Sequence, residues 1–477
     1  MRRILAIALA AVLAASCTGD GAEATSTPAA VKATTTTAPY VAGAEGGGDP
    51  YYPLLGNGGY DVEHYDLAVA YTLDGTVTVD AAIDAVATQN LEALNLDFVG
   101  WTIDAVTIDG VDAAYRRDGG ELTLERLRIS SGSPFAVHVA YHGTPQPLQS
   151  EALPFLLGWF SGPDGEQFVV AQPDGAHAWF PGNDHPSDKA TFSIRLTVPA
   201  GFVAAANGAL AGVSEDDALV TYSWEMQDPM ATYLATVVIG DTWEIEEDAR
   251  STDVSGVRVR NVLPPDIDDE ARRALAKTGE MIVTLEDAFG PYPFDEYGIA
   301  VVGGFEHALE NQTLSVFGRR MVSHPAFEYI LVHELAHQWF GDSVSVAQWS
   351  DIWLNEGFAT YAELLWVEHL YGPAAYREEV ANRIEASIAA EDGPPGTPAS
   401  DDLFNRTVYQ RGSFVLVALR DTVGDDRFFE ILHSHATRHA YGTATTDDFI
   451  ALAEEISARD LDDLFDAWLY GDDLPAR

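Results

Sequence analysis

Apolar and polar residues alternate with a period of two through much of the first half of the chain. The runs with this alternation cover residues 65–71, 76–80, 121–127, 135–141 and 192–198. Turn-forming dipeptides such as Asp74-Gly75 and Asp118-Gly119 separate them. Because successive side chains of a β-strand point to opposite faces, this pattern is typical of half-buried strands. We therefore predict a mostly antiparallel β-domain over residues 58–250.

A different pattern begins near Ser251. Apolar residues then recur every three or four positions, as on one face of an α-helix. Predicted helices cover residues 269–289, 375–390, 413–422, 426–436 and 446–455, and a short strand covers residues 298–302. The predicted fold class is α+β and multidomain, with a largely α-helical domain over residues 251–477 after the β-domain.

The residues before the β-domain have little to bury. Residues 18–57 are rich in Thr, Ala and Gly, with the runs Thr34–Thr37 and Gly46–Gly48. Such a composition cannot offset the conformational entropy that is lost on folding. We predict a flexible linker here.

Residues 1–17 have the features of a signal peptide. Arg2 and Arg3 precede the apolar run Ile4–Ala15, which is too short for an ordinary membrane-spanning helix. The run ends at Cys17, the only cysteine, in a sequence that resembles the bacterial lipobox. We expect an exported protein that a lipid on Cys17 anchors to the outer face of the membrane. A secreted soluble protein is the alternative.

Acidic residues dominate the charge of the chain. The 477 residues include 74 Asp and Glu against 26 Lys and Arg, a formal net charge of −48. Only Lys32, Lys189 and Lys277 are lysines. A surface of this sign repels nucleic acid and anionic lipid headgroups, so we exclude both as electrostatic partners. The sequence leaves the oligomeric state unknown.

The strongest chemical signal is the H-E-x-x-H pattern from His333 to His337. On a helix, positions i and i+4 share a face, so the two imidazoles can bind one metal ion. Zinc in a hydrolase takes three protein ligands, and Glu356 follows at the start of another predicted helix, beyond a break at Gly341. We predict one zinc ion per chain, with Glu334 free to act as general base.

The segments HELAH (333–337), NEG (355–357) and HALEN (307–311) together resemble the aminopeptidase N-like gluzincin zinc metallopeptidases. The resemblance covers roughly residues 60–475. It implies a thermolysin-like catalytic domain, peptide substrates, zinc ligands at His333, His337 and Glu356, and a general base at Glu334. The resemblance ends with the catalytic domain, whereas larger members of the family continue beyond it. We therefore expect an open cleft that admits larger peptides.

The resemblance also implies how a substrate is held. The HALEN segment corresponds to the exopeptidase motif, commonly G-A-M-E-N, with His307 in place of the first glycine. Glu310 would pair with the free α-ammonium of the substrate and so place the first peptide bond at the zinc ion. Ala308 and Asn311 of the same motif are predicted to contact substrate.

Two further positions are predicted from the family pattern. Tyr409, in the segment VYQRGS, would donate a hydrogen bond to the oxyanion of the tetrahedral intermediate. Gln172 falls where many members carry a second glutamate or a glutamine near the substrate amine, and it can accept a hydrogen bond but brings no charge. The segment Trp179–Phe192 resembles a hallmark of the family's β-domain, to which we assign a structural role.

These features predict a zinc aminopeptidase that hydrolyses the N-terminal bond of peptides. A zinc endopeptidase is one alternative, because Gln172 and an open cleft could relax the requirement for a free N-terminus. A non-catalytic, zinc-containing peptide-binding protein is another. Glu334 and Tyr409 argue against it, because a purely structural zinc site needs neither.

Overall fold

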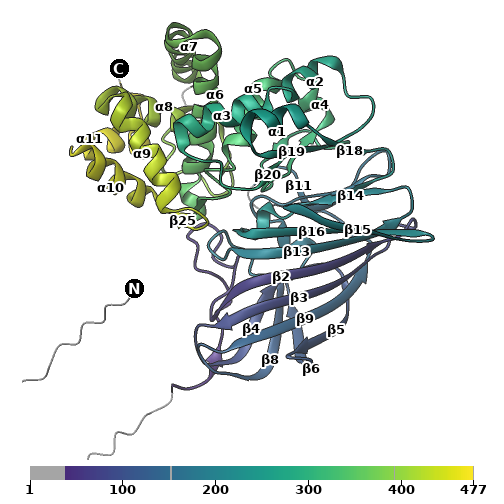
Figure 1. Cartoon of the computed structure of the whole chain (residues 1–477). Coiled ribbons are helices and arrows are strands. Elements are labelled where there is room, and N and C mark those ends of the chain that lie inside the picture. The colour runs from purple at the N-terminus through teal and green to yellow at the C-terminus, as the bar shows by residue number, and fades with distance from the viewer. Residues whose placement is uncertain (1–37, 151–152, 391–392, 476–477) are drawn as a thin grey trace, which may run out of the picture. The chain divides into compact units, whose positions relative to one another are not determined.

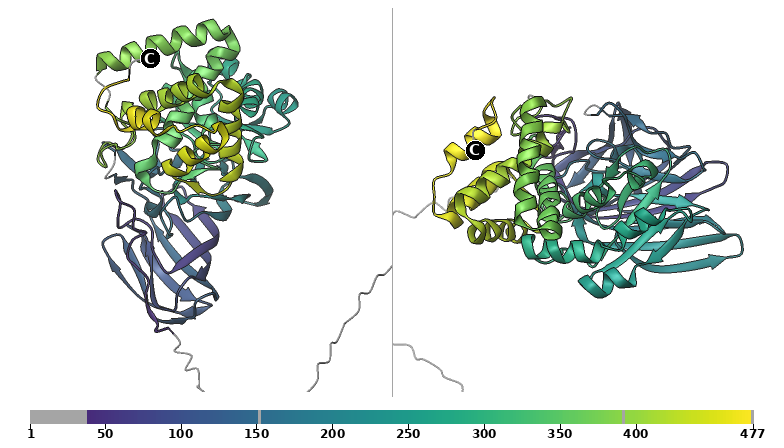
Figure 2. Two further views of the ribbon diagram at one scale, coloured as in Figure 1. Left: turned by 90° about the vertical axis from the view of Figure 1, so that its left-hand side faces the viewer. Right: turned by 90° about the horizontal axis from the view of Figure 1, so that it is seen from above.

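The computed structural model describes residues 38–150, 153–390 and 393–475, and the chain forms one compact unit from Tyr40 onward. A strand-rich part comes first and a helical part follows it, as predicted (Figure 1). Figure 2 shows the helices gathered on one side of the long strands. In the described ranges, no helix is both long and apolar enough to cross a bilayer.

An eight-stranded sheet dominates the β-domain. Its strands, in spatial order, are β15 (Ala209–Asp216), β16 (Leu219–Met230), β13 (Ala190–Pro199), β2 (Tyr60–Tyr71), β3 (Val77–Ala87), β9 (Pro134–Gly143), β5 (Thr102–Ile108) and β6 (Val111–Asp112). Neighbours are antiparallel except for β13 and β2. Along β2 and β3 buried and more exposed residues alternate, so the predicted period-two strands are confirmed.

Two smaller sheets complete the β-domain. One contains β1 (Val41–Ala42), β4 (Leu91–Asp97), β8 (Glu121–Ile129) and β7 (Ala114–Asp118). The other contains β10 (Leu148–Gln149), β11 (Leu156–Ser161), β12 (Gln167–Val170), β17 (Val237–Gly240) and β14 (Val203–Ala206). In the second of these sheets, β12 ends two residues before Gln172, which is one of the predicted site residues.

The helical part contains a sheet of its own. Its strands are β18 (Glu244–Glu247), β19 (Arg258–Leu263), β20 (Glu296–Tyr297), β21 (Ile299–Val302), β22 (Ala308–Leu309) and β23 (Ser315–Gly318), and a separate pair is β24 (Ser345–Val346) with β25 (Thr443–Ala444). Strand β18 pairs with β19, so this sheet begins a few residues before the predicted boundary at Arg250. Strand β21 confirms the short strand predicted at residues 298–302.

Eleven α-helices occur in the described residues. They are α1 (Ala249–Ser255), α2 (Asp269–Leu275), α3 (Thr278–Phe289), α4 (Arg319–Val322), α5 (Phe327–Ala336), α6 (Trp353–Tyr371), α7 (Pro373–Ala390), α8 (Arg406–Val423), α9 (Asp425–Arg438), α10 (Thr446–Ser457) and α11 (Asp462–Phe465). The single helix predicted for residues 269–289 is wrong, because the structure divides it into α2 and α3. The Thr278 hydroxyl donates to the Leu275 carbonyl and caps the end of α2.

The prediction of a linker over residues 18–57 is wrong for its last part. From Tyr40 the chain is folded: β1 pairs with β4, and the carboxylate of buried Asp49 accepts a hydrogen bond of 2.8 Å from the backbone of Trp349. The Tyr51 and Tyr52 hydroxyls donate to carbonyls of residues 398 and 400. These contacts join the segment to the helical part. The earlier linker residues and the predicted signal peptide at residues 1–17 lie outside the described residues.

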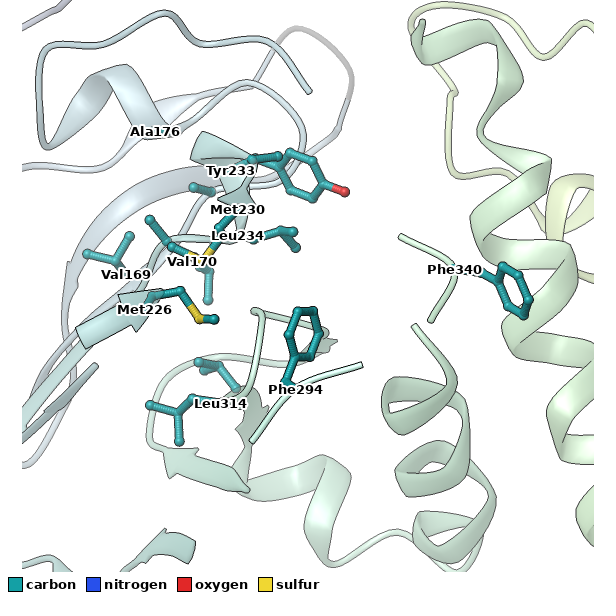
Figure 3. Close-up of a cluster of buried hydrophobic side chains, with 14 of the residues drawn as sticks. Val169, Val170, Ala176, Met226, Met230, Tyr233, Leu234, Phe294, Leu314 and Phe340 are labelled. Carbon is teal, nitrogen blue, oxygen red and sulfur yellow. The ribbon is translucent and has the colours of Figure 1, made fainter. Parts of the chain in front are cut away.

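The β-domain and the helical part share one hydrophobic core. Figure 3 shows Val169 and Met226 of the β-domain in the same cluster as Phe294 and Leu314 of the helical part. All four side chains are nearly or fully excluded from solvent. Burial of apolar surface on this scale favours a fixed arrangement of the two parts. Residues from both can therefore build a single site between them.

Candidate active site

Helix α5 and the start of α6 bring the three predicted metal ligands together. His333 lies in α5, His337 follows its last turn, and Glu356 lies in the first turn of α6. One carboxylate oxygen of Glu356 is 3.4 Å from the Nε2 atom of each histidine. Gly341, with φ +134, turns the chain between the two helices, as predicted. The three side chains are buried and their ligand atoms converge on one point.

The Nδ1 atoms of His333 and His337, which do not face Glu356, show that the three predicted ligands fit a zinc ion. Nδ1 of His333 is 3.0 Å from a carboxylate oxygen of Glu363, and Nδ1 of His337 is 3.1 Å from the carbonyl oxygen of Phe340. Both acceptors place the proton on Nδ1, so the lone pair of each Nε2 faces Glu356. Two imidazoles and one carboxylate with hydrogen-bonded outer nitrogens are typical of a catalytic zinc site.

The charges around the three ligands favour a divalent cation. Burial raises the pKa of Glu334 to about 7, while His333 and His337 act in the opposite direction. Burial also disfavours the charged form of Glu356, but the imidazoles outweigh it and lower the pKa of this carboxyl group to about 2. Glu310 adds a third buried carboxylate within reach of His337. Three buried carboxyl groups thus surround two imidazoles, and a bound dication would favour the ionised form of each carboxyl group.

A cavity of about 320 Å³ contains most of the predicted site residues. Its lining includes the three metal ligands, Glu334, Glu310, Gln172, Ala308 and Tyr409. Asn311 lies behind the cavity instead: it is buried, and its amide donates to the Leu234 carbonyl at 3.0 Å. The structure therefore gives Asn311 a role in holding the loop, which differs from the predicted contact with substrate.

Glu310 is held at the cavity wall by two amide side chains. The Gln172 amide, from the β-domain, donates a hydrogen bond to the Glu310 carboxylate. Gln338, next to the second zinc ligand, donates to the Glu310 backbone carbonyl at 3.0 Å. Burial raises the pKa of Glu310, and the nearby imidazole of His337 acts in the opposite direction. A ligand that brings a positive charge would therefore stabilise the ionised carboxylate.

Two glycines bring Tyr409 to the zinc ligands. A Cβ atom on Gly357 of α6 would lie 2.8 Å from the backbone carbonyl carbon of Gly412 in α8, and one on Gly412 would lie 3.0 Å from the Cα of Gly357. The helices can cross this closely only because both residues lack a side chain. The Tyr409 ring then stacks on His333 at 5.9 Å between centroids. Burial raises the pKa of Tyr409 well above its usual value, which keeps the phenol protonated.

Other residues, which were not predicted from the sequence, support the site from behind. Glu363, which holds His333, also forms an ion pair of 2.9 Å with Arg383 of α7. It follows Glu356 by seven residues, a spacing that places both on one helix face and could have indicated it. The position of Phe155 had no sequence signal. Its ring stacks on His307 at 4.7 Å, and both line the cavity.

Comparisons with known proteins agree with this geometry. Residues 61–234 match the Peptidase M1 N-terminal domain and residues 273–468 match the Peptidase family M1 domain. The M1 zinc metallopeptidase from Deinococcus radiodurans, solved as a variant bound to a Tyr-Ser-Ala substrate, is similar with a TM-score of 0.83 and 30% sequence identity. That likeness covers 90% of this chain and 98% of the other.

Relatives with curated names include aminopeptidases from plants and animals. Aminopeptidase M1 from Arabidopsis thaliana is 26% identical over 86% of this chain and 49% of its own length. Endoplasmic reticulum aminopeptidase 1 from Rattus norvegicus is 26% identical over 67% of this chain and 36% of its own length. The chain thus spans half or less of the length of these relatives. The ligand geometry and the two domain matches together show that the chain belongs to peptidase family M1 and that its metal is zinc.

Proposed function

We propose that the protein is a zinc-dependent aminopeptidase that removes the first residue of peptides. The observation that carries this proposal is the presence of the Glu310 carboxylate in the same cavity as the zinc ligands. Glu310 and the Gln172 carbonyl oxygen would bind the substrate ammonium, since the Gln172 amide nitrogen is already used by Glu310. This would place the first peptide bond beside the residues that hold the metal.

The chain's own residues supply the proton transfers and part of the charge stabilisation. When bound, zinc supplies Lewis acidity to the attacking water and the scissile carbonyl. Glu334 accepts the proton of that water and delivers it to the nitrogen of the leaving group. The Tyr409 hydroxyl donates a hydrogen bond to the oxygen of the tetrahedral intermediate, where negative charge develops. Burial raises the pKa of Glu334 to about 7, which suits this carboxyl group both to accept the proton and to release it.

Fluorogenic aminoacyl amides test the proposal. The full chain is assayed with free-amine substrates and their N-acetylated forms, with and without a chelator, beside Glu334→Gln. We expect cleavage of free-amine substrates alone, lost on chelation, restored by zinc and absent in the variant. Cleavage of acetylated substrates at similar rates would instead favour the endopeptidase. Zinc binding without cleavage of any substrate would favour a peptide-binding protein.

We also propose that the protein is exported and anchored by a lipid on Cys17, because residues 1–17 have the pattern of a lipoprotein signal. Expression of the chain with labelled palmitate and detergent phase separation test this. The wild type should incorporate label and enter the detergent phase, whereas Cys17→Ser should do neither. Equal partition of both proteins into the aqueous phase would support the secreted soluble alternative.

A further inference from the structure

The turn after α5 holds one zinc ligand in place. The Phe340 carbonyl accepts from Nδ1 of His337 at 3.1 Å, so the position of this carbonyl fixes the ring orientation. The next residue, Gly341, cannot carry a side chain, because a Cβ there would lie 3.2 Å from Nδ1 of His337 and because its φ is +134. Any group that fixes the turn at residues 340–343 therefore acts on the zinc ligand.

Two side chains of the β-domain bind consecutive carbonyls of this turn. The Tyr233 hydroxyl donates to the Gly341 carbonyl at 3.2 Å. In Figure 3 this hydroxyl points out of the apolar cluster, toward the side on which Phe340 lies. The Lys189 ammonium donates to the Asp342 carbonyl at 2.6 Å and to the Ser343 carbonyl at 2.9 Å. The turn thus receives donors from the β-domain in addition to the Ser345 hydroxyl of the helical part, which donates to the Gly341 carbonyl at 2.7 Å.

The choice of lysine at position 189 fits this arrangement. A third carbonyl, that of Gly442 before β25, lies 3.5 Å from the same nitrogen atom. Three carbonyls that converge on one point match the three donors of a compact ammonium, whereas the planar guanidinium of arginine presents its donors in a fork. Arginine supplies nearly all the other basic side chains of this protein, and Lys189 is one of only three lysines.

Lys189 also acts on a buried carboxylate. The Asp342 side chain is fully buried, and within the described ranges neither of its carboxylate oxygens has a hydrogen-bond partner. Burial raises the pKa of Asp342 well above its usual range, Glu310 adds to this, and the charge of Lys189 opposes it. Removal of the Lys189 amino group would leave the Ser343 carbonyl without this donor, and the Asp342 carbonyl with only the Ser345 hydroxyl, at 3.3 Å.

We propose that Lys189 is a positioning residue of the zinc site, which holds the turn after α5 so that the Phe340 carbonyl keeps His337 oriented toward the metal. The segment that contains it, Trp179–Phe192, therefore has a role in metal binding in addition to its structural one. The proposal concerns how the chain holds zinc, so it does not depend on which bond the enzyme cleaves.

Zinc affinity and a cobalt spectrum test this proposal without any substrate. The dissociation constant for zinc is measured by competition with a chromophoric chelator for the wild type, Lys189→Met and Lys277→Met. Lys277 is the matched control, because its ammonium also contacts the zinc helix, through Glu328 at 2.7 Å, but at the opposite end from the turn. Cobalt-substituted proteins then report ligand geometry through their visible absorption.

We expect Lys189→Met to bind zinc roughly 10- to 100-fold more weakly, the range found when the outer partners of zinc ligands are removed. Its cobalt spectrum should differ from that of the wild type, and Lys189→Arg should recover part of the affinity. Lys277→Met should match the wild type. If Lys189→Met does not fold, Tyr233→Phe removes one hydroxyl from the same turn and should show a smaller loss of affinity. A lower melting temperature with unchanged zinc affinity and cobalt spectrum would overturn the proposal.

Discussion

The Glu310 carboxylate lies in the zinc cavity and receives a hydrogen bond from Gln172. Glu310→Gln keeps the size of the side chain and removes its charge. A hydrogen bond to a charged group contributes about 1.5–3 kcal/mol, so we expect kcat/KM for free-amine substrates to fall roughly 10- to 100-fold, mainly through KM. Steady-state kinetics measure this, with zinc content as the control. Unchanged KM for free-amine substrates would show that another group binds the amine.

Tyr409→Phe should change kcat and leave KM nearly unchanged, the reverse of the effect expected for Glu310→Gln. The phenyl ring preserves the stacking on His333, while the donor to the oxyanion is lost. Removal of one such donor costs about 10²- to 10³-fold in kcat. We therefore expect kcat to fall by this factor with KM nearly unchanged, measured on the same substrates as for Glu310→Gln. Equal kcat values in the variant and the wild type would exclude a catalytic role for the hydroxyl group.

The sequence predicted individual site residues well where their spacing along one helix determines their geometry. His333 and His337 are such a pair, because any helix places positions i and i+4 on one face. Supporting contacts between elements were not predictable in this way. The stacking of Phe155 on His307 and the hydrogen bond from Lys189 to the zinc turn depend on how the β-domain packs, and neither leaves a periodic pattern.

At the scale of elements, the crossing of α6 and α8 connects Glu356 to Tyr409 through Gly357 and Gly412. Gly357→Ala would place a methyl group against the backbone of α8 and push the helices apart. Overpacking of this kind costs about 1–3 kcal/mol. We expect a lower melting temperature together with a lower kcat, because Tyr409 moves away from the zinc ligands. Ala362→Gly, further along α6, is a control for helix propensity, and its kcat should not change.

Helix α9 carries a buried histidine that makes the fold sensitive to acid. His435 packs against Phe340, Phe358 and Phe449, and burial lowers its pKa to about 3. Between pH 3 and pH 6.5 the unfolded chain binds a proton that the folded chain does not, so stability falls as the pH falls through this window. Through this window His435 lowers the free energy of unfolding by about 1.4 kcal/mol for each unit by which the pH falls.

Substitution of this residue tests the prediction. Urea unfolding measures the free energy of unfolding at pH 6.5 and pH 4.5. This free energy should fall less between the two pH values in His435→Leu than in the wild type. His433→Leu, on the same helix, is the control. Parallel stability curves for His435→Leu and the wild type would contradict the prediction.

The elements with a clear period were predicted, and those that depend on tertiary contacts were not. Strands β2 and β13 alternate along their length, so their existence followed from the sequence. The segment that begins at Tyr40 did not, because its Gly- and Ala-rich composition hides three anchoring residues. Asp49, Tyr51 and Tyr52 bind backbone groups 300 to 348 positions away in the sequence, and no local pattern indicates such partners.

At the scale of the whole molecule, the net charge of −48 should oppose folding. Self-repulsion among acidic groups is screened over about 30 Å at 0.01 M salt and over about 3 Å at 1 M. We therefore expect the melting temperature to rise as sodium chloride increases, with the same rise in potassium chloride at equal ionic strength. A melting temperature that falls or stays constant with salt would show that the acidic groups are not a net destabilising factor.

The two parts of the chain build one site, because the β-domain supplies Gln172 to the cavity and Lys189 to the turn after α5, while the helical part supplies the zinc ligands and Glu310. The most direct test of this account is mass spectrometry of one synthetic peptide, incubated as a mixture of its free and N-acetylated forms. We predict a ladder of products shortened from the N-terminus of the free form, and an intact acetylated form. Internal cleavage of the acetylated peptide at a comparable rate would contradict the assignment of Glu310 as the anchor of the free N-terminus.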